Sequence, residues 1–156
     1  MNDLAVRHVD ELTIRRAEPG DLHRLLELYG TLATPGDPDL SPTRARQTLD
    51  AIEALPGYRI YLAEEGTSVV GTCSIITLPN LAHGGACVGV VENVVVAAEA
   101  RGRGVGRAMM DFARKRCREA GCYKLMLTSN RAREAAHRFY DALGYERSGY
   151  AFTVTP

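Results

Sequence analysis

The chain has 156 residues, which suits one domain over residues 1–156 and is enough to bury a core without disulfides or a metal. Its 19 lysines and arginines balance its 19 aspartates and glutamates, so a general polyanion binder is disfavoured while a locally basic site is not. Residues 1–21 contain no apolar core resembling a signal peptide, and no window approaches the roughly 20 apolar residues of a membrane span. We therefore expect a cytoplasmic protein without a membrane partner.

The first part of the chain predicts a strand followed by two helices. Residues 12–17 alternate as a strand, and residues 18–33 carry leucines and a tyrosine at helical spacing. Residues 41–57 predict the second helix, because Ser41 is a plausible N-cap and Pro42 suits the first helical position.

The middle of the chain predicts three strands. Residues 58–78 read as two alternating strands around a turn near Gly66. After a loop, the run CVGVVENVVVA at 87–97 is too apolar for a half-exposed strand and too rich in β-branched residues for a favoured helix. It indicates a central strand buried on both faces, interrupted by Glu92 and Asn93.

The last part predicts a helix at 104–120, a strand at 123–129, a helix at 130–145 and a final hairpin at 145–155. Gly121 marks the end of the first of these helices. The order of elements along the chain predicts an α/β protein with a mixed sheet.

The cysteines indicate packing and give no sign of a metal site. They form no C-x-x-C pair, and each lies in an apolar stretch where a reduced thiol behaves as a small hydrophobe. Cys87 and Cys122 have neither a helix start nor a histidine beside them in sequence that would lower a thiol pKa. We expect no metal, and we expect these cysteines to be core residues.

A glycine-rich stretch, RGRGVGR at 101–107, lies between the central strand and the next helix. Backbone amides at a helix start carry unpaired donors, and glycine lets an anion approach them closely, so phosphate is the natural ligand. The Walker A motif needs Lys-Ser/Thr where this chain has Arg107 and Ala108, and the dinucleotide motif needs a glycine at 107. A purely structural role, easing a tight strand-to-helix turn, remains the alternative.

The wider pattern resembles a known family. Arg101-x-x-Gly104-x-Gly106 after an apolar strand is similar to the acetyl-CoA signature of the GNAT superfamily of N-acetyltransferases. The segments ENVVV, RGRGVGRAMM, GCYKLML and HRFYDALGY follow in the family's order over about residues 85 to 147, and they resemble the glucosamine-6-phosphate N-acetyltransferase branch. The resemblance implies a splayed central sheet flanked by about four helices, with acetyl-CoA as cosubstrate and a primary amine as acceptor.

The resemblance also implies where acetyl-CoA binds. The strand at 92–96 would part from the strand at 123–128, and the pantetheine arm would pair with backbone in that cleft, which is sensible for a peptide-like group. The pyrophosphate would rest on the loop and helix start. The implied cofactor-binding residues are Val94, Val95, Val96, Arg101, Gly102, Arg103, Gly104, Val105, Gly106, Arg107, Asn130 and Tyr140. Asn130 is equally an N-cap for the last helix.

Two side chains are the candidates for catalysis. Glu92 interrupts an apolar strand and is our candidate general base, with substrate orientation as the alternative. Tyr140 matches the tyrosine that serves as general acid in the family, although beside Phe139 it would otherwise be a core residue. A backbone amide near Val94 would hold the oxyanion. The resemblance implies direct attack in a ternary complex, without an acetylated cysteine.

The acceptor is less well defined. Glu92, Asn93 and His83 are the expected substrate contacts, His83 because a similar His-Gly-Gly stretch occurs in the glucosamine-phosphate branch. The chain departs from that branch at Asn93, where the branch has Asp, and at Thr128-Ser129, where it has Asp-Cys. The segment SNRAREAAHRFY also resembles aminoalkylphosphonate acetyltransferases, so a small anionic amine is a second possibility.

Other functions compete with this interpretation. An acyl-CoA-binding sensor would keep the cleft and lose catalysis, and a protein amine is an alternative acceptor. A nucleic-acid module would use the basic residues of the helix at 104–120, but the neutral total charge and the lack of interleaved aromatics disfavour it. We expect no nucleic-acid partner, and we expect a homodimer because a C-terminal strand often pairs with a second copy.

Overall fold

The computed structural model describes residues 12–155, so the first part of the stretch examined for a signal peptide lies outside it. One open sheet runs in the order β1-β2-β3-β4-β5. Neighbouring strands are antiparallel from β1 to β4, whereas β4 and β5 are parallel. The strands are β1 (Leu12–Arg16), β2 (Tyr58–Glu65), β3 (Ser68–Leu78), β4 (Cys87–Val96) and β5 (Cys122–Met126).

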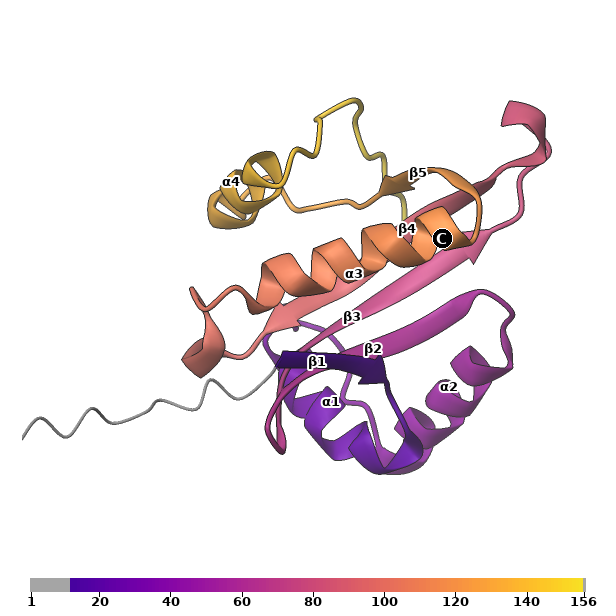
Figure 1. Ribbon diagram of the computed structural model, residues 1–156. Coiled ribbons are helices and arrows are strands. Elements are labelled where there is room, and N and C mark those ends of the chain that lie inside the picture. Colours follow the sequence, from indigo (N-terminus) through magenta and orange to yellow (C-terminus); the bar gives the residue numbers. More distant parts are fainter. Residues whose placement is uncertain (1–11, 156) are drawn as a thin grey trace, which may run out of the picture.

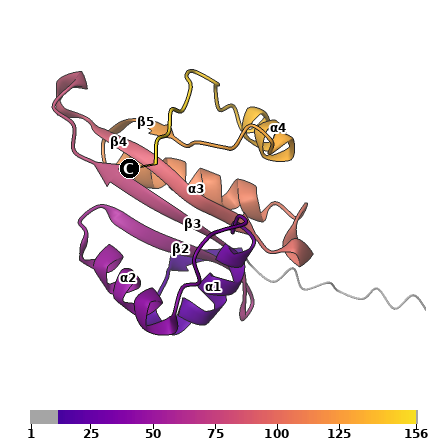
Figure 2. The same ribbon diagram turned by 180° about the vertical axis from the view of Figure 1, so that it is seen from behind.

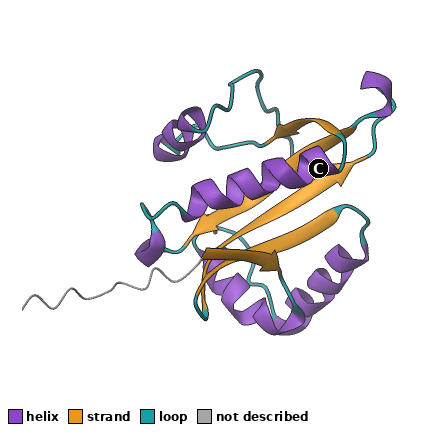
Figure 3. Cartoon of the chain, in the orientation of Figure 1, coloured by secondary structure: helices purple, strands orange, loops and turns teal. Residues whose placement is uncertain are grey.

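Helices cover both faces of this sheet (Figures 1 and 2). Two of them, α1 (Leu22–Gly30) and α2 (Pro42–Ala54), lie on one face, and α3 (Val105–Glu119) lies along the other. The last helix, α4 (Glu134–Ala142), lies past the end of β5 and beside the first part of α3 (Figures 1 and 3). Short 3-10 helices at Pro19–Asp21, His83–Gly85 and Ala98–Ala100 complete the described elements. The expected α/β class and mixed sheet are confirmed.

Local signals in the sequence explain where several elements begin and end. Ser41 caps α2 as predicted, because its hydroxyl accepts a hydrogen bond from the amide of Arg44 at 3.2 Å. The turn at Gly66 joins β2 and β3 as a hairpin. One helix starts later than expected, since Pro19–Asp21 forms a 3-10 turn that Arg15 anchors through two 2.8 Å bonds to Asp21.

The core has one layer on each face of the sheet. The buried residues of α3 are Val105, Met109, Met110, Ala113 and Cys117, at the helical spacing that the sequence predicts. Phe112, also expected to face inward, is partly buried and meets the ring of Tyr61 edge-on. On the opposite face, Leu25 and Leu49 pack against β2, while Leu28 packs against the end of β4.

The predicted C-terminal hairpin is wrong. No strand forms between residues 145 and 155, and residues 146–155 are exposed. Two short arms separated at Gly149 make at best a marginal hairpin, because an isolated pair of strands has little apolar surface to bury. The last helix is also shorter than predicted, since it starts at Glu134 and ends at Ala142.

None of the helices within residues 12–155 is both long enough and apolar enough to cross a bilayer. The cytoplasmic location stays a prediction.

Candidate active site

The loop between β4 and α3 suits an anion. Gly102 and Gly104 have φ of 74° and 87°, in the left-handed region that favours glycine, and Gly104 is the N-cap of the 15-residue helix α3. A Cβ at either position would meet nothing within 4 Å, so the loop surface above them is open. Exposed amides at the positive end of a long helix make a favourable phosphate site.

A third glycine brings α4 close to this loop. A Cβ at Gly106 would lie 3.1 Å from Cζ of Phe139 and 3.6 Å from a methyl group of Val96. Because glycine leaves this space free, the first turn of α3 packs directly against Phe139 of α4. The residue after Phe139 is Tyr140, so the packing at Gly106 fixes where the candidate acid lies relative to the candidate phosphate loop.

The arginines of the loop divide into different roles. Arg101 folds back and donates to the carbonyl oxygen of Val96 at 3.3 Å. Arg103 pairs with Glu65 at the β2–β3 turn, beside a hollow of about 550 Å³ that Arg24 and Glu99 also line. Arg107 is exposed and makes no ion pair within the described residues. The structure therefore leaves Arg107 available to a phosphate and engages the other two elsewhere.

A β-bulge shapes the strand that carries Glu92. Ser74 of β3 lies opposite Glu92, and Thr72 lies opposite Val95, so β4 takes three steps where β3 takes two. The extra residue is accommodated at Asn93, whose φ of 52° is left-handed, a conformation that asparagine tolerates better than most residues. Asn93 thus has a backbone role, and contact with substrate stays a prediction.

The bulge changes which way the strand's side chains point. Val95 packs with Leu28 of α1. Its partner on β3 is Thr72, and the partner of Glu92 is Ser74. Residues two apart on a strand share a face, so Glu92 lies on the same face of the sheet as Val95. Val94 and Val96 instead pack in the cluster that contains Phe139 and Tyr140. An unbulged strand would have placed Glu92 and Val95 on opposite faces.

The parallel strands part just before this bulge. Their pairing runs from Cys87 with Cys122 to Val90 with Met126, and β5 ends there while β4 continues to Val96. The backbone of β4 beyond Val90 therefore has no β5 partner, which is the splay that the sequence resemblance implies. Main-chain groups left free at such a point can pair with a peptide-like ligand.

Tyr140 is held in an aromatic cluster beside this opening. Its ring meets those of Phe139 and Tyr145 edge-on, at centroid distances of 5.1 and 5.8 Å. Burial is the main cause that raises the pKa of its phenol, Arg133 acts to lower that pKa, and Cys73 and Glu92 raise it further. The phenol is consequently protonated at neutral pH.

Two other predicted site residues lie on loops. His83 is exposed and stacks on Tyr123 at the beginning of β5, with ring centroids 4.1 Å apart, away from the point where the strands part. Asn130 does not cap α4, since the N-cap position is Arg133 and the Asn130 side chain accepts from the amide of Ala132. The N-cap alternative is therefore wrong, because an intervening turn delays the helix, and contact of Asn130 with acetyl-CoA stays a prediction.

Sequence patterns gave no signal for two buried hydroxyl side chains, Ser74 and Tyr29. Ser74 lies opposite Glu92 through the register of β3 against β4, and Tyr29 packs near the end of β4 through the placement of α1. Both placements join segments far apart in sequence, and no local spacing reveals them.

Cys73 and Cys117 are core residues and Cys122 packs against the core, whereas Cys87 is half-buried and belongs to no core cluster. All are free thiols, and burial raises the pKa of both Cys73 and Cys117 to about 12, so neither is a nucleophile at neutral pH. Among residues 12–155, no group of three or more histidine, cysteine or acidic side chains is arranged to hold a metal ion.

A splayed parallel pair beside an anion-binding loop, with a protonated tyrosine at the opening, suits an enzyme that transfers an acyl group from a phosphate-bearing donor. The sequence pattern of the acetyltransferase (GNAT) family matches residues 22–145, and the chain belongs to this family. It is an N-acetyltransferase with the GNAT fold, and acetyl-CoA is the cosubstrate that the family uses.

Relatives with assigned names support this assignment. The chain is 32% identical to a glucosamine 6-phosphate N-acetyltransferase of Trypanosoma brucei brucei, over 86% of this chain and 89% of that protein. It is 33% identical to an aminoalkylphosphonate N-acetyltransferase of Salmonella typhimurium, over 63% of each chain. A solved structure of a putative acetyltransferase from Agrobacterium tumefaciens matches with a TM-score of 0.85 and 37% identity, covering 92% of this chain and 99% of that one.

Proposed function

We propose that this enzyme acetylates the primary amine of a small molecule by direct attack on acetyl-CoA within a ternary complex. The observation that carries this proposal is the parting of β4 from β5 beside the glycine loop, with a buried, protonated Tyr140 at the opening. The loop at 101–106 would hold the pyrophosphate, and the free backbone of β4 near Val94 and Val96 would hold the pantetheine arm.

The reaction needs one proton removed and one supplied. An alkylammonium with a pKa of about 10 must lose a proton, which at pH 7 costs about 4 kcal/mol. Glu92 accepts that proton, the amine nitrogen forms a bond to the acetyl carbon, and the carbon–sulfur bond breaks. Tyr140 donates its proton to the departing thiolate and regains one from solvent, so no covalent acetyl-enzyme forms.

A small amine that carries a phosphate or phosphonate group is the acceptor class we favour. The relatives named above act, by their names, on glucosamine 6-phosphate and on aminoalkylphosphonates, and both are small amines with a phosphorus oxyanion. The departures at Asn93 and Thr128-Ser129 are reasons to test both classes rather than to assume the amino sugar.

The competing functions are less well supported. An acyl-CoA sensor has no need of Glu92 and Tyr140 together. The basic face of α3 is largely engaged within the protein, since Lys115 and Arg116 pair with Glu119, and Arg114 donates to the carbonyl of Leu143. This leaves little unpaired charge for a nucleic acid.

The proposal is tested first by ligand binding and then by turnover. Acetyl-CoA at 100 times its Kd should stabilise the fold by about 2.7 kcal/mol and raise the thermal midpoint, while ATP should not. Thiol release should then follow addition of glucosamine 6-phosphate or an aminoalkylphosphonate, and not of a lysine peptide. Binding without release for any amine would support the sensor, and release with the peptide alone would make a protein amine the acceptor.

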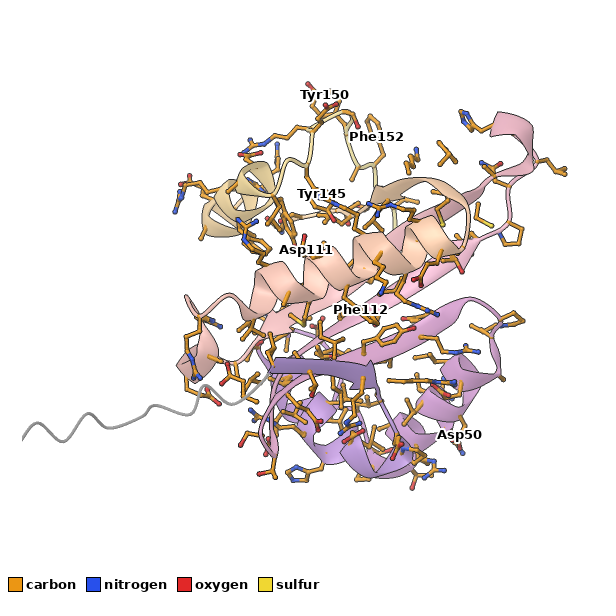
Figure 4. All side chains as sticks on the ribbon, viewed as in Figure 1. Asp50, Asp111, Phe112, Tyr145, Tyr150 and Phe152 are labelled. Atoms are coloured by element: carbon orange, nitrogen blue, oxygen red, sulfur yellow. The ribbon has the colours of Figure 1, made fainter. Side chains whose placement is uncertain are left out.

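We further propose that the enzyme is a homodimer whose C-terminal segments pair with the neighbouring copy. Tyr150, Phe152 and Val154 alternate along this segment and are 92%, 92% and 88% exposed, and Figure 4 shows Tyr150 and Phe152 on the projecting loop. The outer edge of β5 is free in the described chain, with Tyr123 and Met126 partly exposed on it. Unpaired strand edges and clustered exposed apolar side chains favour association.

Replacing Phe152 with serine should therefore convert a dimer to a monomer. The measurement is light scattering across a range of protein concentrations. The dissociation constant of the dimer should rise about tenfold or more in the variant, because one large buried aromatic contact is lost. Leu55→Ser is the control, because Leu55 is half exposed at the end of α2, away from β5. A wild-type monomer at all concentrations would contradict the proposal.

A further inference from the structure

Two buried hydroxyl groups near Glu92 have no hydrogen-bond partner. Ser74 is completely buried, and neither its oxygen nor the phenol oxygen of Tyr29 makes a hydrogen bond of good geometry within the described residues. Buried hydroxyls almost always have a partner, so an orphan pair calls for an explanation.

Strand register places one of these hydroxyls beside the candidate base. Ser74 of β3 lies directly opposite Glu92 of β4, and directly opposed residues in an antiparallel pair project to the same face with their side chains in contact range. The bulge at Asn93 preserves this arrangement, since it ends the regular pairing immediately after Glu92.

The second hydroxyl lies behind the first. Tyr29 is on the last turn of α1 and packs against the end of β4. Burial raises the pKa of its phenol, and the neighbouring hydroxyls of Ser74 and Thr72 act against that rise, so both lie close to it. Thr72 already donates to the carbonyl of Tyr61 at 2.9 Å. Ser74 is thus the neighbour of Tyr29 whose hydroxyl proton makes no hydrogen bond within the described residues.

We propose that Tyr29 and Ser74 are positioning residues for Glu92, with Tyr29 donating to the oxygen of Ser74 and Ser74 donating to the carboxylate of Glu92. This inference rests on the proposed function, in which Glu92 takes the proton of the amine. Both hydroxyls then have a partner, and the row crosses from α1 through β3 to β4. Fixing the carboxylate in one rotamer shortens the search for a productive amine geometry.

Two other ionisable groups lie beside Tyr29, namely Tyr58 of β2 and Cys73 of β3. The row uses neither of them.

The test is the split between kcat and KM for the amine in Tyr29→Phe and Ser74→Ala. Both variants should lower kcat by about tenfold, because the carboxylate is no longer held in one rotamer, and should leave KM nearly unchanged. The Kd for CoA should be unchanged, and Ser74→Thr, which keeps a hydroxyl, should restore the wild-type kcat. Tyr58→Phe is the matched control, since it removes a nearby phenol that is outside the row.

Other outcomes would overturn the inference. An unchanged kcat in both variants, or an equal loss of kcat in Tyr58→Phe, would make the two hydroxyls structural only. Thermal midpoints identify a variant that fails to fold. If Ser74→Ala fails, Tyr29→Phe alone still tests the inference, because it removes only one oxygen atom. Wild-type turnover in Glu92→Gln would also refute the positioning role of Tyr29 and Ser74, but the proposed acetyl transfer would stand. If the wild-type protein itself shows no turnover with any amine, the proposed function is refuted.

Discussion

Replacing Tyr140 with phenylalanine should lower kcat by about 100-fold or more and leave the affinity for CoA unchanged. The ring is held by edge-on contacts with Phe139 and Tyr145, which phenylalanine preserves, so the variant loses the phenol proton and little packing. Without a donor, the thiolate must leave unprotonated. Single-turnover kinetics with saturating acetyl-CoA would separate this chemical step from binding.

The direction of the Tyr140 pKa shift gives this prediction a second readout. Because burial raises that pKa, the phenol keeps its proton to higher pH than an exposed tyrosine would, and the acid form persists across the neutral range. The matched control is Tyr145→Phe, which removes a neighbouring buried phenol and should retain nearly full turnover. Equal losses in both variants would indicate that the aromatic cluster matters only as packing, and Tyr140 would then have no role as an acid.

The elements of this fold that sequence predicts well are those fixed by neighbours along the chain. Ser41 and Pro42 start α2 through contacts within one turn, and the apolar period of α3 follows from a single helix lying on a sheet. The glycine loop belongs to the same group, since a left-handed backbone at Gly104 is a local property.

The features that sequence does not predict depend on contacts between distant segments. Arg103 pairs with Glu65, which lies 38 residues earlier in the chain. The glycine motif alone therefore does not reveal that the Arg103 side chain is engaged away from the candidate phosphate site. The bulge at Asn93 depends on the register between β3 and β4, and it decides that Glu92 faces α1. The C-terminal alternation predicted a hairpin, but no strand among residues 12–155 covers Tyr150 and Phe152.

Replacing Gly104 with valine should raise the Kd for acetyl-CoA by about 100-fold or more, which corresponds to about 2.7 kcal/mol. The φ of 87° at this position disfavours any Cβ, and β-branched residues most of all, so valine would force the N-cap of α3 into another conformation. The amides of the loop would then no longer converge on a phosphate. Calorimetric titration with acetyl-CoA and with CoA measures the loss directly.

Gly121→Val separates this local effect from general strain. Gly121 follows the other end of α3 with φ of 73°, and a Cβ there would also meet nothing within 4 Å. Both variants should therefore lose a similar stability, about 1–2 kcal/mol for a left-handed residue with a Cβ, and show similar falls in thermal midpoint. Only Gly104→Val should lose affinity for acetyl-CoA. Equal affinities in the two variants would mean that Gly104 serves the strand-to-helix turn alone. The phosphate would then have to be held by other groups, among them Arg107, which is exposed and makes no ion pair within the described residues.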